Sequence, residues 1–287
     1  MTTPALRRAR VDTILIATMH GKQVVAADVI REVLGMSSRL AGGLDTDAFG
    51  TFTGEIPRTR SPLATAVAKA EAGLAGSPWA ELALASEGSY GPHPAAPWLA
   101  RGVEEAVLVS RERGLLACGR HVTSETNYGV SFARSVDDGL EQARRYGIPE
   151  HGVIVSAAAA GRPLHHVRCV KGLTRPEEIT TVLDGMLRAF GEVAVESDMR
   201  AHLNPTRMKA IGVAVRRACE ALLDVCPRCT EGGLSESEPV VGAPCETCGL
   251  ETSWPKADIF LCHACGYGEQ RPRAGAVSPR FCGVCNP

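Results

Sequence analysis

The fold is organised around the stretch Leu82-Ala83-Leu84-Ala85-Ser86-Glu87-Gly88-Ser89-Tyr90-Gly91-Pro92-His93-Pro94. Its first four residues are small or branched and apolar, which predicts a buried strand that a glycine-rich polar turn then ends. In an open α/β sheet, ligands bind just beyond the carboxyl ends of the strands. Glu87 would stand at that point between Ser86 and Ser89, and the glycines would let the backbone approach a ligand. We therefore expect the active site here.

Strands and helices alternate on both sides of this stretch. We expect strands at 11–18, 105–110, 115–122 and 153–156, and helices at 23–34, 62–76, 136–146 and 205–223. A capping-box spacing of Thr174 and Glu177 predicts one more helix. Only a short turn joins 105–110 to 115–122, so this pair would be antiparallel and the sheet mixed. The fold class is therefore α/β, with a mixed central sheet flanked by helices over residues 11–223, after a flexible basic tail at 1–10.

The bulk composition limits the classes of partner. With 287 residues and a net charge of -1, the chain predicts one large domain with a small appendage and no strong positive field. Nucleic acid is therefore not favoured as a partner. No apolar run is long enough to span a bilayer, so we expect no membrane association. Eight of the eleven cysteines lie in CxxC pairs, which favours metal ligation in a reducing, cytoplasmic setting.

The cysteine pairs predict a separate metal domain at 224–287. The predicted ligands are Cys226, Cys229, Cys245, Cys248, Cys262, Cys265, Cys282 and Cys285. Eight thiolates make two Cys₄ zinc sites with no position open for substrate, so two structural zinc ions are expected. Pairing of adjacent CxxC units is the simplest arrangement, and a nested one, outer with outer and inner with inner, is the alternative. So short a tail depends on metal ligation for much of its folding free energy.

Cationic and polar residues gather at two turns. Thr18, His20 and Lys22 follow the strand at 11–18 and precede a helix, a standard place for a phosphate. The alternative is a solvated lysine and a histidine that only caps the turn. Late in the chain, Arg200, His202, Asn204 and Arg207 surround a helix start, with Asn204 as its cap. We favour anion binding there over a purely structural Arg–Glu network.

An acidic loop at 44–55 completes the candidate site. Asp45, Asp47 and Glu55 are suited to Mg²⁺ or Mn²⁺, hard cations that bind one or two carboxylates together with substrate phosphates. A surface turn stabilised by the aspartates is the alternative. Asn127 and Lys171 also follow predicted strands and are further candidates for phosphate or base contacts.

Two resemblances extend these inferences. The first rests on the motifs Gly43–Phe52, Ala85–Ser89 and Glu196–Met208 and on the paired CxxC units near the C-terminus. In these features the chain resembles an uncharacterised bacterial family with C-terminal zinc ribbons. This resemblance implies the domain boundaries but no activity. More distantly, the order of elements is similar to that of the inosine/xanthosine triphosphate pyrophosphatases. The matching positions are Thr18 and Lys22, the alanine-rich segment Ala66, Lys69 and Ala70, the acid–glycine turn Glu87-Gly88, and Asn204 to Arg207. Here His20 replaces that family's asparagine, and the turn is one residue shorter.

The functional expectation is a Mg²⁺-dependent hydrolase of a nucleotide or related phosphorylated small molecule. In this hypothesis Glu87 holds the metal, while Lys22 and Arg207 neutralise phosphate charge. The alternative is a non-catalytic protein that senses a nucleotide in the same pocket and docks a protein partner through its zinc domain. A protein guided to nucleic acid by its zinc ribbons is a third hypothesis, which the balanced charge opposes. The sequence leaves the oligomeric state open.

Overall fold

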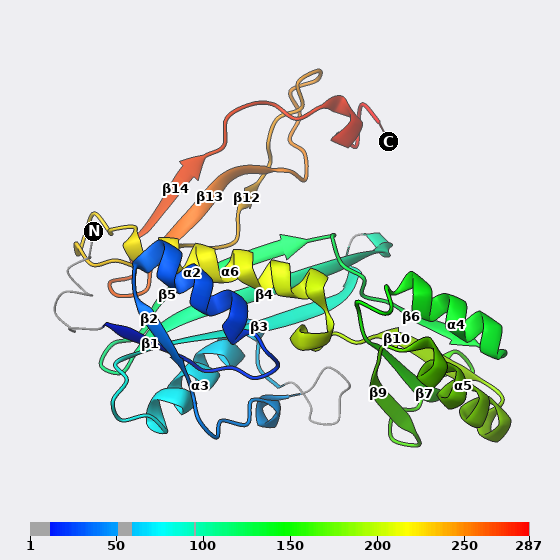
Figure 1. Ribbon diagram of the computed structural model, residues 1–287. Coiled ribbons are helices and arrows are strands. Elements are labelled where there is room, and N and C mark those ends of the chain that lie inside the picture. The colour runs from blue at the N-terminus through cyan, green and yellow to red at the C-terminus, as the bar shows by residue number, and fades with distance from the viewer. Residues whose placement is uncertain (1–11, 51–58, 95, 287) are drawn as a thin grey trace.

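The computed structural model describes residues 12–50, 59–94 and 96–286. Within these ranges the chain forms five α-helices and three sheets (Figure 1). The expected mixed α/β class is confirmed. The predicted tail at 1–10 and the candidate ligand Glu55 lie outside the described residues. No helix in the described ranges has both the length and the apolar character to cross a membrane.

The first sheet is mixed, as expected. Its strands, in spatial order, are β2 (Ser37–Leu40), β1 (Thr13–Ile16), β3 (Leu82–His93), β4 (Ala96–Ser110) and β5 (Gly114–Thr123). The strand β1 runs parallel to β2 and β3, whereas β3, β4 and β5 form antiparallel neighbours. The hairpin of β4 and β5 confirms the antiparallel pair predicted from the sequence.

Three helices cover this sheet. They are α2 (Gln23–Leu34), α3 (Pro62–Ala75) and α6 (Pro205–Leu223). Alternate residues of the strands point to opposite faces, so Ile14 and Leu84 pack with α2 and α6, while Leu15 and Ala83 pack with α3. Figure 1 shows α2 beside α6 on one side of the sheet and α3 on the other. Both faces of the central strands are therefore buried, which matches their continuous apolar runs.

The second sheet lies beside the first and is antiparallel. Its strands are β6 (Val130–Ala133), β10 (Val193–Ser197), β7 (Val153–Ala159), β8 (Arg162–Pro163) and β9 (Cys169–Leu173). The helices α4 (Val136–Arg145) and α5 (Pro176–Phe190) cover one face of this sheet, where Val155, Leu183 and Val195 share a core. Its opposite face carries the alternate residues of β7 and β10 and is available to line a site.

Local capping signals explain where most helices begin. Ser61, Ser135 and Asn204 each accept a hydrogen bond from a backbone N–H of the first helical turn, which confirms the predicted cap at Asn204. The predicted cap at Thr174 is wrong, because α5 begins at Pro176 with Arg175 as its N-cap and without a side-chain cap bond. The residue before a proline avoids the helical region, and Arg175 is accordingly extended.

The strand that carries Glu87 does not end there, contrary to the prediction. β3 continues to His93 because β4 pairs with it along its whole length, with Glu87 opposite Glu105. Gly88 makes room for the Glu104 side chain of the paired strand instead of forming a turn. Glu87 nevertheless lies beyond the carboxyl end of β1, whose last residue, Ile16, pairs with Leu84.

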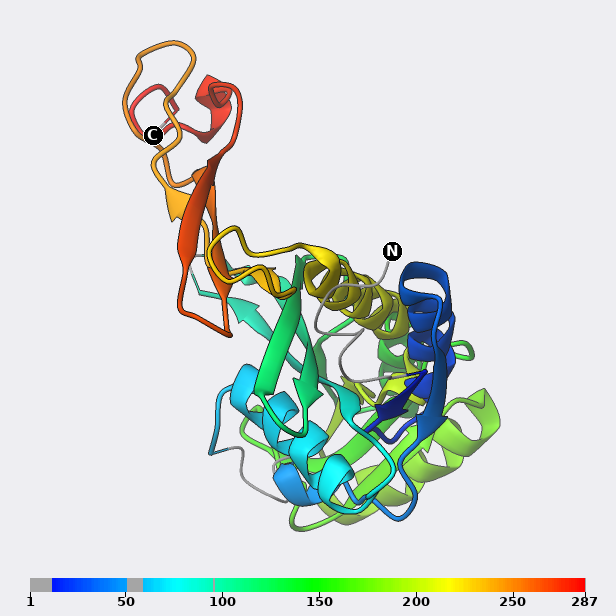
Figure 2. The same cartoon turned by 90° about the vertical axis from the view of Figure 1, so that its left-hand side faces the viewer.

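The C-terminal segment forms the third sheet. Its elements are β11 (Leu234–Glu236), β12 (Val240–Val241), β13 (Pro255–Cys262), β14 (Gly268–Pro272) and the 3₁₀ helix η3 (Pro279–Phe281). This part projects away from the first sheet, and its tip lies far from the helices of the main body (Figure 2). The domain boundaries at 11–223 and 224–287 stay predictions.

Candidate functional site

A pocket of about 370 Å³ is lined by residues from both α/β sheets. The first sheet contributes the turn between β1 and α2, one residue of α3 and two residues of β3. The second sheet contributes β6, β7, β10 and the loops around them. Its volume lies in the range of small-molecule sites, which are commonly found where two structural units meet.

The pocket gathers many of the residues predicted from the sequence. Its lining includes Thr18, His20, Lys22, Ser86, Glu87, Lys171, Arg200 and Arg207. Asp45, Ser89, Asn127, His202 and Asn204 are not part of the lining. Asp45 and Ser89 are exposed. Asp47 lies in the 3₁₀ helix η1 (Asp47–Phe49), and its side chain is outside what the structure describes.

Lys22 is buried at the N-terminus of α2. The turn that places it requires a positive φ at both His20 (62°) and Gly21 (75°). Its side chain points inward with 6% exposure, and Nζ donates to the backbone oxygen of Ser86 at 3.0 Å and to its Oγ at 3.3 Å. Both acceptors are neutral. Across the described ranges, no carboxylate lies at ion-pair distance from Lys22.

Burial lowers the pKa of Lys22 to about 8, and the positive charge of Arg207 acts in the same direction. The carboxylates of Glu104 and Glu87 oppose this change but do not cancel it. A buried ammonium without a paired anion is costly, so the pocket contains a cation whose charge is incompletely compensated.

Glu87 is held by a lysine from α3. Lys69 Nζ lies 2.5 Å from Glu87 Oε2, and both residues are buried. Lys69 belongs to the alanine-rich helix, where small neighbours such as Ala66 and Ala70 let the helix pack closely on β3. Glu87 therefore faces the pocket as one partner of a buried ion pair, and a ligand cation would compete with Lys69 for its carboxylate.

Arg207 is paired with an acid that sequence reasoning missed. Its Nε donates to Glu104 Oε1 at 2.6 Å, and Tyr90 OH donates to the same oxygen at 3.0 Å. Burial is the largest single influence and lowers the pKa of Arg207, but the charge and hydrogen bond of Glu104, with Tyr90 and Glu87, together outweigh burial and raise it. Glu104 is fully buried on β4, one residue before the strand start expected at 105. Two consecutive acids, Glu104 and Glu105, between Val103 and Ala106 at the edge of an apolar run were the available signal.

The late polar run mostly holds its own backbone together. Arg200 Nη2 lies 2.6 Å from Asp198 Oδ2, and Asn204 Nδ2 donates to Asn127 Oδ1 at 2.8 Å. His202 stacks on His20 with 5.2 Å between ring centroids. Burial lowers the pKa of His202, and the neighbouring His20 adds to this effect. The run therefore contains the structural network weighed as the alternative, although Arg200 and Arg207 also line the pocket.

The second sheet supplies a pair that the sequence did not single out. His165 Nε2 lies 2.5 Å from Glu196 Oε2, and both residues line the pocket. Ser156 Oγ donates to the same oxygen at 3.5 Å. Because Val193 and Val195 face the helices, strand alternation places Glu196 on the opposite face of β10. That alternation in the stretch 193–197 was the only available signal.

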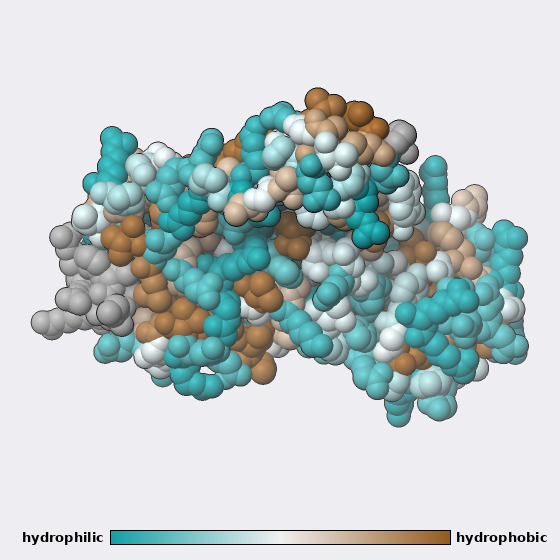
Figure 3. All heavy atoms as spheres, turned by 90° about the horizontal axis from the view of Figure 1, so that it is seen from above, coloured by the Kyte–Doolittle hydropathy of each residue, from teal (hydrophilic) through white to brown (hydrophobic). Residues whose placement is uncertain are grey.

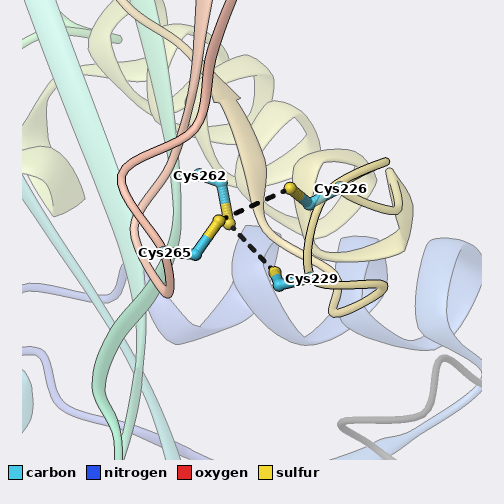
Figure 4. A group of neighbouring side chains, drawn as sticks. All are labelled: Cys226, Cys229, Cys262 and Cys265. Atoms are coloured by element: carbon cyan, nitrogen blue, oxygen red, sulfur yellow. Dashed lines mark hydrogen bonds between the residues drawn. The ribbon is translucent and has the colours of Figure 1, made fainter.

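The eight cysteines form two groups of four. Cys226, Cys229, Cys262 and Cys265 make the first, and Cys245, Cys248, Cys282 and Cys285 make the second. In each group the four sulfurs lie within 4.8 Å of one another, and Figure 4 shows those of the first group converging. Four thiolates in this arrangement suit a tetrahedral structural zinc ion. Two such ions could therefore be bound.

Both pairings expected from the sequence are wrong, because the first CxxC unit joins the third and the second joins the fourth. The sheet explains this interleaving. β13 returns antiparallel to β11, with Cys262 opposite Leu234, and so brings the third unit back beside Cys226 at the end of α6. The second CxxC unit lies further along the projecting tail, where it meets the fourth unit, Cys282 and Cys285.

The two cysteine groups differ in their surroundings. The first packs against β5: Cys118 N donates to Ser235 Oγ at 2.9 Å, and a Cβ on Gly233 would lie 2.0 Å from the Leu116 oxygen. Near the second, large apolar side chains are exposed, namely Leu250, Trp254, Phe281 and Val284. Seen from above, the protein's mostly hydrophilic surface is interrupted by hydrophobic patches (Figure 3).

Fold and sites together define a mixed α/β protein with a pocket between two sheets and a C-terminal tail of two four-cysteine metal groups. The chain belongs to the family described as Domain of unknown function (DUF6671), whose model matches residues 72–287. The matched segment contains Glu87, Arg207 and all eight metal-group cysteines, whereas Lys22 and Lys69 precede it. No curated protein and no solved structure matches the chain.

Proposed function

We propose that the pocket binds a phosphorylated small molecule, most concretely a nucleotide, and that the protein hydrolyses it with the help of Mg²⁺. The observation that carries this proposal is Lys22, a buried cation whose two hydrogen-bond acceptors on Ser86 are neutral. A phosphate oxygen beside Lys22 would supply the missing negative charge. The positive end of the α2 dipole, where no side chain of the described residues caps the helix, would favour the same anion.

The wider electrostatics support an anionic ligand. Lys22, Lys171 and Arg200 line the pocket from three separate segments, and Lys69 and Arg207 add two more cations. Lys69, Arg200 and Arg207 are ion-paired with acids, whereas Lys22 is not paired with any acid of the described ranges, so a ligand phosphate would meet several donors in one pocket. Such convergent donors stabilise the negative charge of a bound phosphate and of a phosphoryl group under attack.

Glu87 supports the metal-dependent form of the proposal. Mg²⁺ commonly uses one or two protein carboxylates and takes its remaining ligands from phosphates and water. Glu87 would hold the ion once Lys69 shifts to the phosphate, and the ion would then shield the phosphate charge. In the described ranges, the groups of three or more potential ligands consist only of cysteines. The proposed ion therefore arrives with its substrate.

The likeness to the inosine/xanthosine triphosphate pyrophosphatases supports the substrate class. The turn with Thr18 and Lys22, the alanine-rich helix with Lys69, and Glu87 correspond in order to that family's phosphate and metal segments. In the structure these residues line one pocket. The alternative is a nucleotide sensor. The ion pairs favour it, because the carboxylate of Glu87 and the guanidinium of Arg207 are already bound to other side chains.

The test compares binding with turnover. The purified protein is incubated with normal and deaminated nucleoside triphosphates and with Mg²⁺ or Mn²⁺, while thermal shift and pyrophosphate release are followed. We expect both stabilisation and turnover in the wild type. Lys22→Met should lose both, whereas Lys209→Met, an exposed lysine on α6, should lose neither. Stabilisation without turnover would support the sensor. Neither effect with any nucleotide would refute the proposal.

A further inference from the structure

The part of the pocket formed by the second sheet contains a hydrogen-bonded acid–imidazole pair. Glu196 projects from β10, and His165 lies in the loop between β8 and β9. Their 2.5 Å contact joins Nε2 to Oε2, and Ser156 on the neighbouring strand β7 contacts the same oxygen. Both side chains are partly exposed to the pocket, at 24% for His165 and 18% for Glu196.

The geometry resembles that of an oriented base. A carboxylate that accepts from one ring nitrogen fixes the tautomer of a histidine and leaves the other nitrogen as an acceptor. With Nε2–H donating to Glu196, the lone pair of Nδ1 can take a proton. Glu196 itself is fixed by two donors from different segments, so its orientation does not depend on His165 alone.

We propose that His165 is the general base of the pocket and that Glu196 is its positioning residue. This inference rests on the hydrolase function proposed above. A water molecule gives its proton to Nδ1 of His165 while its oxygen forms a bond to phosphorus. The bond between phosphorus and the leaving-group oxygen breaks, and that oxygen keeps the electron pair. The resulting imidazolium is stabilised by Glu196 until it releases the proton to solvent.

The other candidates for a base are less suitable. Glu87 is bound to Lys69, and Lys22 would be needed in its protonated form to bind the phosphate. Asp198 is fully buried and bound to Arg200. His165 faces the pocket from the second sheet, whereas the proposed phosphate contacts at Lys22 and Lys69 come from the first-sheet unit. A substrate in the pocket would therefore meet the base and the cations on different walls.

The experiment uses the full-length protein and the triphosphate that the wild type turns over fastest. His165→Gln should lower kcat by about 10²- to 10⁴-fold, the usual contribution of a general base, with KM changed less than about twofold. His166→Gln is the matched control, because His166 is the exposed neighbour in the same loop. It should keep the wild-type kcat. Melting curves would show that each variant folds.

Glu196→Gln provides the second variant. Removing this charge should shift the acidic limb of the kcat profile to lower pH and reduce kcat, which a merely structural contact would not do. Lys171 on β9 also lines this pocket, and it is present in both the wild type and Glu196→Gln. A folded His165→Gln protein with wild-type kcat, or with an equal loss in nucleotide affinity and turnover, would overturn the assignment of the base.

The outcomes also separate this inference from the function on which it rests. If the wild type hydrolyses a nucleotide and His165→Gln does so equally well, only the base assignment fails. If the wild type binds nucleotides without turnover, the base assignment fails and the phosphate site at Lys22 stands. If it neither binds nor hydrolyses them, both proposals fail.

Discussion

The carboxylate of Glu104 occupies the space that a side chain at position 88 would need. A Cβ on Gly88 would lie 2.2 Å from Glu104 Oε1, and one on Gly102 would lie 2.3 Å from the Tyr90 ring. These two glycines therefore let a buried acid and an aromatic ring lie across the pair of β3 and β4. Glu104 in turn binds Arg207, which joins the sheet to the start of α6 next to the pocket.

Substituting Gly88 should destabilise the protein through this contact. Gly88→Ala would displace Glu104 and break its buried pair with Arg207, a loss of about 3 kcal/mol or more. Gly91→Ala is the matched control on the same strand, because a Cβ there meets nothing within 4 Å. It should change stability by less than about 0.5 kcal/mol. Urea denaturation measures both, and equal stabilities of the two variants would contradict the close approach of Glu104 to Gly88.

Lys22 should make the folded protein less stable at neutral pH than it would be without this charge. Its pKa is about 8 in the folded state, compared with an ordinary value of 10.5. Between these values the unfolded chain binds more protons, so the contribution of Lys22 to stability rises with pH over this window, by about 3 kcal/mol at most.

The variant Lys22→Met removes this titration. It should be more stable than the wild type at pH 7, and its free energy of unfolding should rise less between pH 8 and 10.5. Lys209→Met should follow the wild-type curve. If the free energy of unfolding changes with pH in the same way for the wild type and Lys22→Met over this window, the charge of Lys22 is compensated in the folded state.

The interleaved cysteine groups make a prediction about zinc content. The wild type should hold two zinc ions per chain. Cys226→Ser with Cys262→Ser changes one group only and should leave one ion. Cys226→Ser with Cys245→Ser changes both groups and should leave none. Elemental analysis of the purified variants measures this, and one ion retained by the second pair would instead support adjacent pairing.

Asn204 should contribute more than a helix cap. Its Oδ1 accepts from Arg207 N at 2.9 Å, while its buried amide donates to Asn127 and to the Asp198 oxygen. Asn204→Ala should cost about 2–3 kcal/mol, because the cap is lost and buried polar partners remain unsatisfied. Ser135→Ala, at the exposed cap of α4, should cost only about 1 kcal/mol. Thermal unfolding compares them; similar losses would mean that the contacts to Asn127 and Asp198 add nothing.

Local sequence signals located the five helices of the described ranges and the strands β1, β3, β4, β5 and β7 because their causes are local. The bounds of α2 and α6 agree with prediction, since apolar spacing, Asn204 and Pro205 act within one or two helical turns. The continuation of β3 past Glu87 was not predictable in this way. It depends on β4, which pairs with residues that look like a turn when considered alone.

Several residues of the candidate site were also recognisable in the sequence. Lys22, Glu87 and Arg207 stood out as polar residues next to apolar elements, and all three line the pocket. Their partners did not stand out. Glu104 and His165 are paired with residues 103 and 31 positions away along the chain, and no local pattern connects such positions.

By itself the sequence determined that the chain contains helices, buried strands and eight cysteines in pairs suited to zinc, because propensity, alternation and ligand spacing are properties of neighbouring residues. Only the tertiary structure decided which cysteine pairs share a site and which acid neutralises which cation. Those choices depend on how β13 returns to β11, and on which side chains β3, β4 and α6 bury together. Pairing in space follows from the packing of the whole chain.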